Sequence, residues 1–200
     1  MFKSIKNEAE AEIIEKKSKF IAKIIAVNSK EEAEKKLEQV RKKYHDAKHH
    51  TYAYIIGNIE KCSDDGEPSG TAGSPLLDLL KNNKLSNVII IVTRYFGGIL
   101  LGTGGLVRAY TESAKKAIEN AEIIEKEYGI RYCVEISYKN IKEIEYICKQ
   151  LEINIKKSEY KENVVMLLES NKEKKEKLEN SGIEILSEKM IEDNIIINKI

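Results

Sequence analysis

The sequence predicts an α+β protein of two domains. Over residues 11–120, strand segments rich in β-branched residues alternate with amphipathic helical segments. The composition changes near residues 125–129, where a new pattern begins in the order strand, helix, strand, strand, helix, strand. That order is typical of a ferredoxin-like domain. We therefore expect an amino-terminal domain over residues 1–129 and a ferredoxin-like carboxy-terminal domain over residues 130–200.

In the first domain, apolar alternation predicts strands near residues 11–15, 20–27 and 51–56. The segment Ser29-Lys30-Glu31-Glu32 has the pattern of a capping box, which predicts that a helix begins there. A short helix is expected from Ser74-Pro75, because proline suits a first helical turn. Residues 87–93 form a continuous apolar run, as in a strand covered on both faces. A glycine loop over residues 97–105 then leads into a further helix.

In the second domain, alternation predicts strands at residues 130–136, 153–158 and 164–169. A helix is expected after Asn140, a candidate cap, over residues 141–151. The pattern Ser170-x-x-Glu173 predicts the start of a second helix, which should stop at Gly182. The last strand is expected to begin over residues 183–186.

The composition argues against several classes of protein. The 34 Lys and Arg residues nearly balance the 33 Asp and Glu residues, so the net charge gives no sign of a nucleic-acid partner. Three cysteines without metal-ligand spacing do not fit a disulfide framework and favour a reducing compartment. The amino terminus lacks an apolar signal core, and the aliphatic run at residues 88–92 is too short to span a bilayer. We expect a cytoplasmic protein with no membrane partner.

Eight of the eleven glycines lie between Ser63 and Ala114. The segment GGILLGTGGLVRAY places glycines before a predicted helix, and the N–H groups and dipole at a helix start favour an anion. It has neither the lysine of a Walker A loop nor the spacing G-x-G-x-x-G, so a nucleotide P-loop is not indicated. Two interpretations stay open, a general anion or nucleic-acid phosphate site and a structural role in tight packing and turns.

Three acids, Asp64, Asp65 and Glu67, lie together in the loop SDDGEPSG. Carboxylates can hold a hard cation, but this spacing does not match an EF-hand. An Asp-Gly turn closed by Glu-Pro explains the residues without a metal. A further alternative is that the acids pair with Arg94 or Arg108 and lock the loop. We predict neither a metal site nor a cofactor.

His49 is the best candidate for acid–base chemistry, because it precedes a predicted strand and can face the acidic loop. A histidine in such a place more often serves as a hydrogen-bonding partner. His45 and His50 lie close by, but a metal site needs more ligands at matched geometry. Nothing sets a nucleophile apart, so the sequence favours a binding protein over an enzyme.

Basic residues concentrate between Lys81 and Ile118, where six Lys or Arg residues accompany one acid. Arginines interleaved with aromatic residues, as at Arg94-Tyr95-Phe96, suit contacts with single-stranded nucleic acid. Tyr110 follows Arg108 but fits a core stripe better. The candidate nucleic-acid or anion-binding residues are Arg94, Tyr95, Gly97, Gly98, Gly102, Gly104, Gly105, Arg108 and Lys115.

Four segments, HHTYAY, SDDGEPSGTAGSP, VTRYFGG and LGTGGLVRAY, together resemble the signature of the IMPACT family. The resemblance is strong over about residues 10–120, and the second domain resembles the carboxy-terminal domain of bacterial members. The sequence departs from the family at Thr51, where a cysteine is common, and at His50, where an asparagine is common. The polar residues of the matching motifs are His49, Asp64, Asp65 and Glu67.

The resemblance implies a first domain of the type shared by a small-subunit ribosomal protein, GHMP kinases and domain four of elongation factor G. It implies a second domain similar to domain five of that factor. Eukaryotic members of the family act in translational control, whereas bacterial members have no settled activity and no agreed catalytic residues.

The first hypothesis is therefore a translation-associated regulatory protein that binds RNA or the ribosome through the basic, glycine-rich surface. An alternative is an enzyme or binding protein for a phosphorylated small molecule or nucleotide, with the anion at the helix start near Gly104. A third is a protein-interaction adaptor that contacts a partner in the translation machinery through the surface near Tyr95 and Phe96.

Overall fold

The computed structural model describes residues 1–198, and their backbone forms two compact units. The first spans Phe2–Ile124, and the second begins at Glu125. The boundary predicted after residue 129 falls inside β7 (Ile123–Ile136), a strand that starts in the first unit and continues through the second. None of the helices in the described part of the chain is long and apolar enough to cross a membrane.

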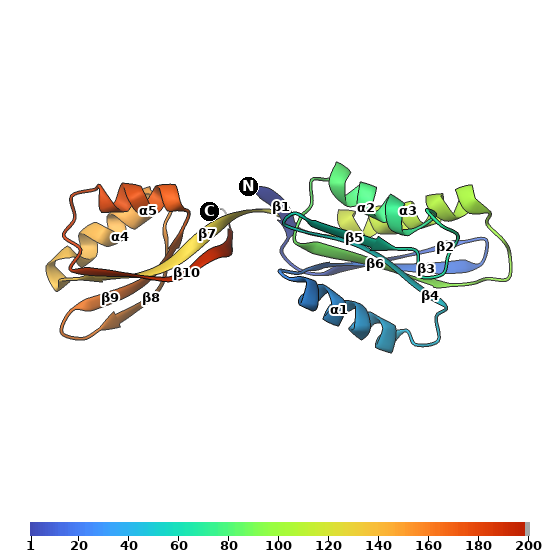
Figure 1. The fold of residues 1–200 in the computed structure, drawn as a ribbon, viewed down its shortest axis with the longest axis horizontal. Helices are drawn as coiled ribbons and strands as arrows, with labels where there is room; N and C mark the ends of the chain where they lie inside the picture. The colour runs from blue at the N-terminus through green and yellow to red at the C-terminus, as the bar shows by residue number, and fades with distance from the viewer. Residues whose placement is uncertain (199–200) are drawn as a thin grey trace. The chain divides into compact units, whose positions relative to one another are not determined.

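The first unit is built on an antiparallel sheet in the order β2-β3-β6-β4-β5 (Figure 1). Its central strand, β6, is apolar over residues 88–92 because both faces of the sheet are covered, and its last three residues are Thr93, Arg94 and Tyr95. The helices α2 and α3 cover one face, and α1 covers the other (Figure 1). The bounds are β2 (Ala9–Glu15), β3 (Ser18–Ala26), α1 (Lys30–Lys43), β4 (His49–Ile56), β5 (Ile59–Ser63), α2 (Gly73–Asn82), β6 (Val88–Tyr95) and α3 (Thr103–Glu119).

Alternation along the strands divides the first unit into two cores. In β6, Ile90 packs with α2 and α3, while its neighbours Ile89 and Ile91 pack with α1. Successive side chains of a strand point to opposite faces, so a strand between two helical layers must be apolar at every position. The structure thus confirms the prediction that residues 87–93 form a doubly covered strand.

The helix start predicted at Ser29 is present, with one difference from a capping box: Glu32 binds the N–H of Asn28, which precedes the N-cap residue. The Ser29 hydroxyl accepts a hydrogen bond from the Glu32 N–H at 3.2 Å, and the Glu32 carboxylate accepts one from the Asn28 N–H at 2.8 Å. Two short strands of this unit were not predicted, β1 (Phe2–Ile5) and β5. Neither has the alternating apolar pattern from which the other strands were read, and β5 is an edge strand that is mostly exposed.

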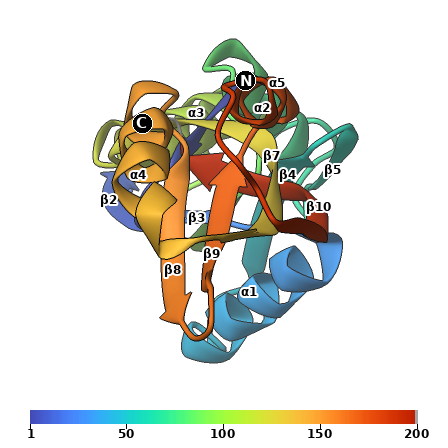
Figure 2. The same cartoon turned by 90° about the vertical axis from the view of Figure 1, so that its left-hand side faces the viewer.

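The second unit has the ferredoxin-like order β-α-β-β-α-β, as predicted. Its sheet is antiparallel in the order β10-β7-β9-β8. Two helices cover one face of this sheet (Figures 1 and 2). After β7, the bounds are α4 (Ile141–Gln150), β8 (Asn154–Tyr160), β9 (Val164–Ser170), α5 (Lys172–Glu179) and β10 (Ser187–Asn198).

Two local predictions for this unit were wrong. Ser170 does not cap α5, because it ends β9 with its hydroxyl buried beside the Tyr132 hydroxyl at 3.3 Å. The cap is Asn171, whose side chain accepts a hydrogen bond from the Lys174 N–H at 2.9 Å. Residues 183–186 are also not a strand, although Ile183 is buried in the core. The strand β10 begins only at Ser187, so burial of an apolar side chain there does not require strand pairing.

Candidate functional site

Asp64 holds the acidic loop against the start of α2. One carboxylate oxygen accepts hydrogen bonds from the N–H groups of Ala72 at 2.9 Å and Gly73 at 2.8 Å, and the other accepts from Gly70 at 2.9 Å. The helix has no cap from its own N-cap residue, so Asp64 supplies the negative charge that a helix start favours. Burial opposes ionisation, but the three N–H donors outweigh it and lower the pKa of Asp64.

Asp65 ties the loop to α1 and β4. Its two carboxylate oxygens accept from the Arg41 guanidinium at 3.0 Å and from the His50 N–H at 2.6 Å. Its backbone carbonyl lies 2.8 Å from Nδ1 of His49. Both acids of the Asp-Asp pair are thus occupied in holding the loop, which supports the metal-free interpretation of this segment.

Glu67 is paired with Arg94 in the interior. Oε1 of Glu67 accepts from Nη1 of Arg94 and from the Tyr110 hydroxyl, each at 2.7 Å. The Arg94 guanidinium carbon lies 5.4 Å from the Phe20 ring centre and 5.6 Å from the Phe96 ring centre, which is cation–π contact on both. Burial and the charge of Glu67 raise the pKa of Tyr110, so its hydroxyl remains a donor. One polar atom is left over, since the buried Nε of Arg94 has no hydrogen-bond partner.

His49 is held with a defined orientation. A carbonyl oxygen can only accept, so Nδ1 of His49 donates to the Asp65 carbonyl and the neutral ring keeps its lone pair on Nε2. Nε2 lies 3.9 Å from Oε1 of Glu67. His50 instead faces Thr93 at 3.1 Å, and burial lowers its pKa. Of the clustered histidines, His49 is the one beside Glu67 and Arg94.

An opening of about 410 Å³ lies against this buried group. The polar side chains at its wall are Lys48, His49, Glu67 and Arg94, and Gly102 and Thr103 at the start of α3 also contribute. The remaining lining is largely apolar and comes mainly from the loop between β6 and α3. These lining residues include Phe96, Leu100, Leu101 and Leu106.

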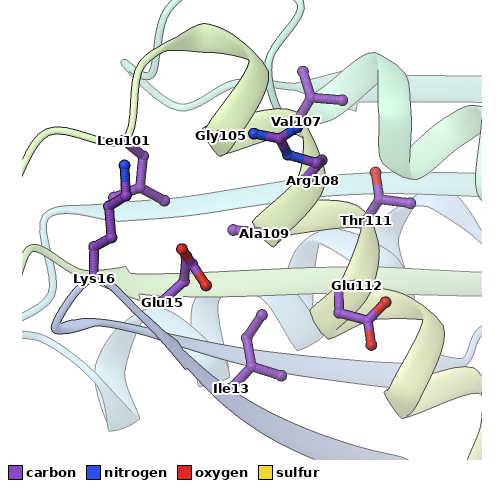
Figure 3. Close-up of a pocket in the computed structure, with 10 residues that line it drawn as sticks. All are labelled: Ile13, Glu15, Lys16, Leu101, Gly105, Val107, Arg108, Ala109, Thr111 and Glu112. Atoms are coloured by element: carbon purple, nitrogen blue, oxygen red, sulfur yellow. The ribbon is translucent and has the colours of Figure 1, made fainter.

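A second opening of about 600 Å³ lies on the other side of Leu101, which lines both. Figure 3 shows Lys16, with Glu15 and Ile13, across from Arg108 and Glu112 of α3. Two bases and two acids line it, so its charge is balanced. Arg108 is exposed and lies here, separate from buried Arg94.

The other predicted site residues have separate places. The Tyr95 hydroxyl donates to Asp46 at 2.7 Å, and this bond raises the pKa of Tyr95 to about 12. Lys115 lies on the exposed face of α3, 3.8 Å from Glu119, and lines neither opening. Sequence reasoning did not single out Arg41 or Thr103, because each acquires its role from a partner or opening far along the chain or across a loop.

The glycines of the loop differ in what holds them. A Cβ at Gly97 would lie 2.0 Å from the Lys17 carbonyl carbon, so close packing on the turn between β2 and β3 requires glycine. Gly98 and Gly102 have φ values of +83° and +72°, which favour glycine. A Cβ at Gly105 would meet the Leu101 side chain at 3.0 Å, whereas one at Gly104 would meet nothing within 4 Å.

Within residues 1–198, no group of three or more His, Cys, Asp or Glu side chains is arranged to hold a metal ion. Cys62, Cys133 and Cys148 are free thiols.

Comparison with known proteins identifies the family. The Impact N-terminal domain matches residues 16–118, more than half of the chain. The chain belongs to the IMPACT family. A domain of unknown function, DUF1949, matches residues 134–187, so the IMPACT domain is followed by the second domain expected for bacterial members.

Relatives within the IMPACT family match most of this chain. IMPACT family member YvyE of Bacillus subtilis (strain 168) is 37% identical over 164 residues, which cover 80% of this chain and 76% of the relative. IMPACT family member YigZ of Escherichia coli (strain K12) is 36% identical over 156 residues, which cover 76% of each chain. A crystal structure described as that of a hypothetical protein matches with a TM-score of 0.67 and 29% identity, covering 93% of this chain and 96% of that one.

Proposed function

We propose that this IMPACT-family protein is a translation-associated regulatory protein that binds single-stranded RNA, free or within the ribosome. The link with translation rests on the IMPACT family, because its eukaryotic members act in translational control. The binding surface is a cationic loop surface that we define by the apolar residues Phe96, Ile99 and Leu100 and the bases Lys16, Lys17, Lys48 and Arg108.

One observation carries the proposal: an exposed apolar loop is ringed by bases that have no ion-pair partner. Phe96, Ile99 and Leu100 are 53%, 42% and 83% exposed. Within the described residues, none of the four bases forms an ion pair. Proteins bind single-stranded nucleic acid with this combination of groups. The nucleobases stack on aromatic side chains, and Lys or Arg side chains contact the phosphates.

The packing brings these bases to one loop from separate elements. Gly97 packs on the backbone of Lys17, and its N–H donates to the Ser18 hydroxyl at 3.1 Å, which joins the loop to the turn that carries Lys16 and Lys17. Lys48 lines the opening on one side of Leu101, and Arg108 lines the opening on the other. The sequence predicted that Arg94 binds the nucleic acid directly. Because Arg94 is buried and contacts the Phe96 ring, we instead assign it the role of supporting Phe96.

A salt titration of binding to a short oligouridylate tests the proposal. Neutralising about four phosphates should give a log–log slope of roughly −3 on single strands. The double variant Lys48→Ala/Arg108→Ala should reduce the slope by roughly 1.4 units. Lys42→Ala is the matched control, because Lys42 is exposed on α1 on the opposite face of the sheet.

Absence of any RNA or ribosome association at low salt would remove the proposal. Association with ribosomes that survives nuclease treatment and ignores Lys48→Ala/Arg108→Ala would instead favour the protein-adaptor alternative. Variant Lys115→Ala tests how far the surface extends along α3, and an unchanged slope would confine it to the loop.

A further inference from the structure

We propose that the opening between His49, Arg94 and the start of α3 binds a small phosphate monoester whose body carries hydrogen-bond donors, such as a nucleotide or sugar phosphate. This site goes beyond the cationic loop surface, since it binds a small group in a recess and does not need a polynucleotide. The same chemistry is offered by a free nucleotide and by the 5′-phosphate end of an RNA strand.

The start of α3 offers the donors for the phosphate. The first N–H groups of a helix have no acceptor within it, which here leaves those of Thr103, Gly104 and Gly105. The N-cap residue is Gly102, which has no side chain to cap them. Thr103 adds a hydroxyl. The three terminal oxygens of a phosphate monoester match this group of donors, and the dipole of the helix favours their charge.

Gly104 has no side chain to cover the start of α3, and packing does not require a glycine at this position. It lies in the first turn of α3, and a Cβ added there would meet nothing within 4 Å. Glycine makes a helix less stable than alanine does, because it loses more conformational freedom on folding. Packing explains the glycine at position 97, whereas no neighbouring atom restricts position 104.

Arg94 is the independent sign of a ligand. Its side chain is only 7% exposed, it lines the same opening as Gly102 and Thr103, and its Nε has no hydrogen-bond partner. Buried polar groups without a protein partner are rare in folded proteins, and each calls for a water, an ion or a ligand as its partner. An anion in this opening would give the guanidinium a second partner beside Glu67.

The opposite part of the opening offers acceptors. The lone pair on Nε2 of His49 and the carboxylate of Glu67 both suit ligand hydroxyl or N–H groups. Phe96, Leu100 and Leu106 supply an apolar wall for the body of the ligand. At about 410 Å³, the opening is of the size that small-molecule sites usually have, and a nucleotide has all three kinds of group.

Calorimetric titration of the full chain with UMP, ribose 5-phosphate and uridine tests this site. UMP should bind saturably and at least about tenfold more tightly than uridine, because uridine lacks the phosphate. Thr103→Pro removes one N–H at a position where proline suits a helix, and should weaken UMP binding by about tenfold. Thr103→Ser keeps both the N–H and the hydroxyl and should bind as the parent does.

A second variant covers the case in which Thr103→Pro disturbs the loop. Gly104→Glu places a carboxylate in the first turn, where it suits the helix but repels a phosphate, so the protein should fold and lose UMP binding. If both Thr103→Pro and Gly104→Glu bound UMP as tightly as the parent protein does, the proposal would be overturned, since the anion would then lie elsewhere. Failure of UMP, ribose 5-phosphate and 5′-phosphorylated oligouridylate to bind would overturn it as well.

Oligouridylates with and without a 5′-phosphate identify the source of the ligand. A preference for the phosphorylated strand over UMP supports the site with an RNA end as its ligand, and the reverse supports a free nucleotide. The two proposals of function separate in the same experiment. Binding of UMP without binding of long RNA would remove the cationic loop surface alone, and salt-sensitive RNA binding without phosphate-monoester binding would remove this site alone.

Discussion

Two arginine–glutamate pairs, one in each compact unit, put the same residue types to different uses. Arg94 and Glu67 are both buried, with side chains 7% and 3% exposed. Arg131 of β7 and Glu169 of β9 lie opposite each other in the second sheet, and the arginine side chain is 35% exposed. Glu169 has Lys156 as a further partner at 3.5 Å.

The difference between the pairs is in how completely they are satisfied. Nε and Nη2 of Arg131 both donate to Glu169, at 2.9 and 2.6 Å, and Nη1 donates to Glu192. Arg94 makes one bond to Glu67 and has a buried Nε without a partner. A fully satisfied, half-exposed network supports a sheet. A buried pair that is incompletely satisfied and borders an opening is suited to receive something else.

The two pairs should differ most in how much stability is lost when the arginine is removed. Arg94→Ala leaves Glu67 buried without its cation and should destabilise the first unit by about 3–5 kcal/mol. Arg131→Ala should cost the second unit about 1 kcal/mol or less, because Arg131 is partly exposed and Lys156 remains a partner of Glu169. Native-state hydrogen exchange of β6 and β9 in the full chain measures both, and equal losses would contradict the comparison.

Gly97 in the loop before α3 and Gly104 in the first turn of α3 contrast a glycine that packing requires with one that no neighbour restricts. Gly97→Ala places a Cβ against the backbone of Lys17 and should destabilise the first unit by about 1–3 kcal/mol. Gly104→Ala meets no neighbour and should stabilise α3 by roughly 0.5–1 kcal/mol. Urea unfolding followed by exchange of the α3 amides compares them. A loss of stability in Gly104→Ala would mean that the fold itself needs that glycine.

The stability of the first unit should depend on pH because of Asp64 in the acidic loop. The pKa of Asp64 is lowered below the ordinary 3.8. The carboxylate therefore stabilises the folded state fully above pH 3.8, and this stabilisation is lost as the pH falls through the lowered pKa. Asp64→Asn should cost about 1 kcal/mol at neutral pH, because an amide nitrogen cannot accept the backbone N–H groups. The difference from the parent should shrink in acid, and a difference that is constant with pH would exclude this role.

The smallest expected effect concerns Tyr95, which contrasts with buried Tyr110. Hydrogen bonding to Asp46 raises the pKa of Tyr95 from 10.0 to about 12. The bond therefore stabilises the folded state fully below pH 10.0, and this stabilisation is lost as the pH rises through about 12. Near-ultraviolet absorbance follows tyrosine ionisation, and Tyr95→Phe identifies its step. Asp46→Asn should return that step toward its ordinary position. An unshifted step in the parent would mean that Asp46 and Tyr95 do not pair in solution.

Local pattern predicted the elements whose apolar residues repeat within one segment. The continuous apolar run of β6, the helix start at Ser29 and the second-domain order of strands and helices were all predicted from such local patterns. It missed β5, an exposed edge strand held by pairing with β4. It also placed the last strand too early, since Ile183 is buried without being in a strand.

The candidate site was predicted only in part, for a related reason. The motifs marked His49, Asp64, Asp65 and Glu67, and pairing of an acid with Arg94 was one of the alternatives that the sequence left open. The structure brings Glu67 and Arg94 together across 27 residues. The contacts of Arg41 with Asp65 and the place of Thr103 beside the opening had no local signal.

The sequence by itself determined the secondary-structure segments, the second-domain topology and the identity of the unusual loop residues, because these depend on spacing along the chain. Only the tertiary structure decided which charges are buried. Glu67 meets Tyr110 from 43 residues away, and the packing of β6 and α3 removes water from the group that they form with Arg94. Desolvation depends on which distant elements surround a group, and no local spacing records that.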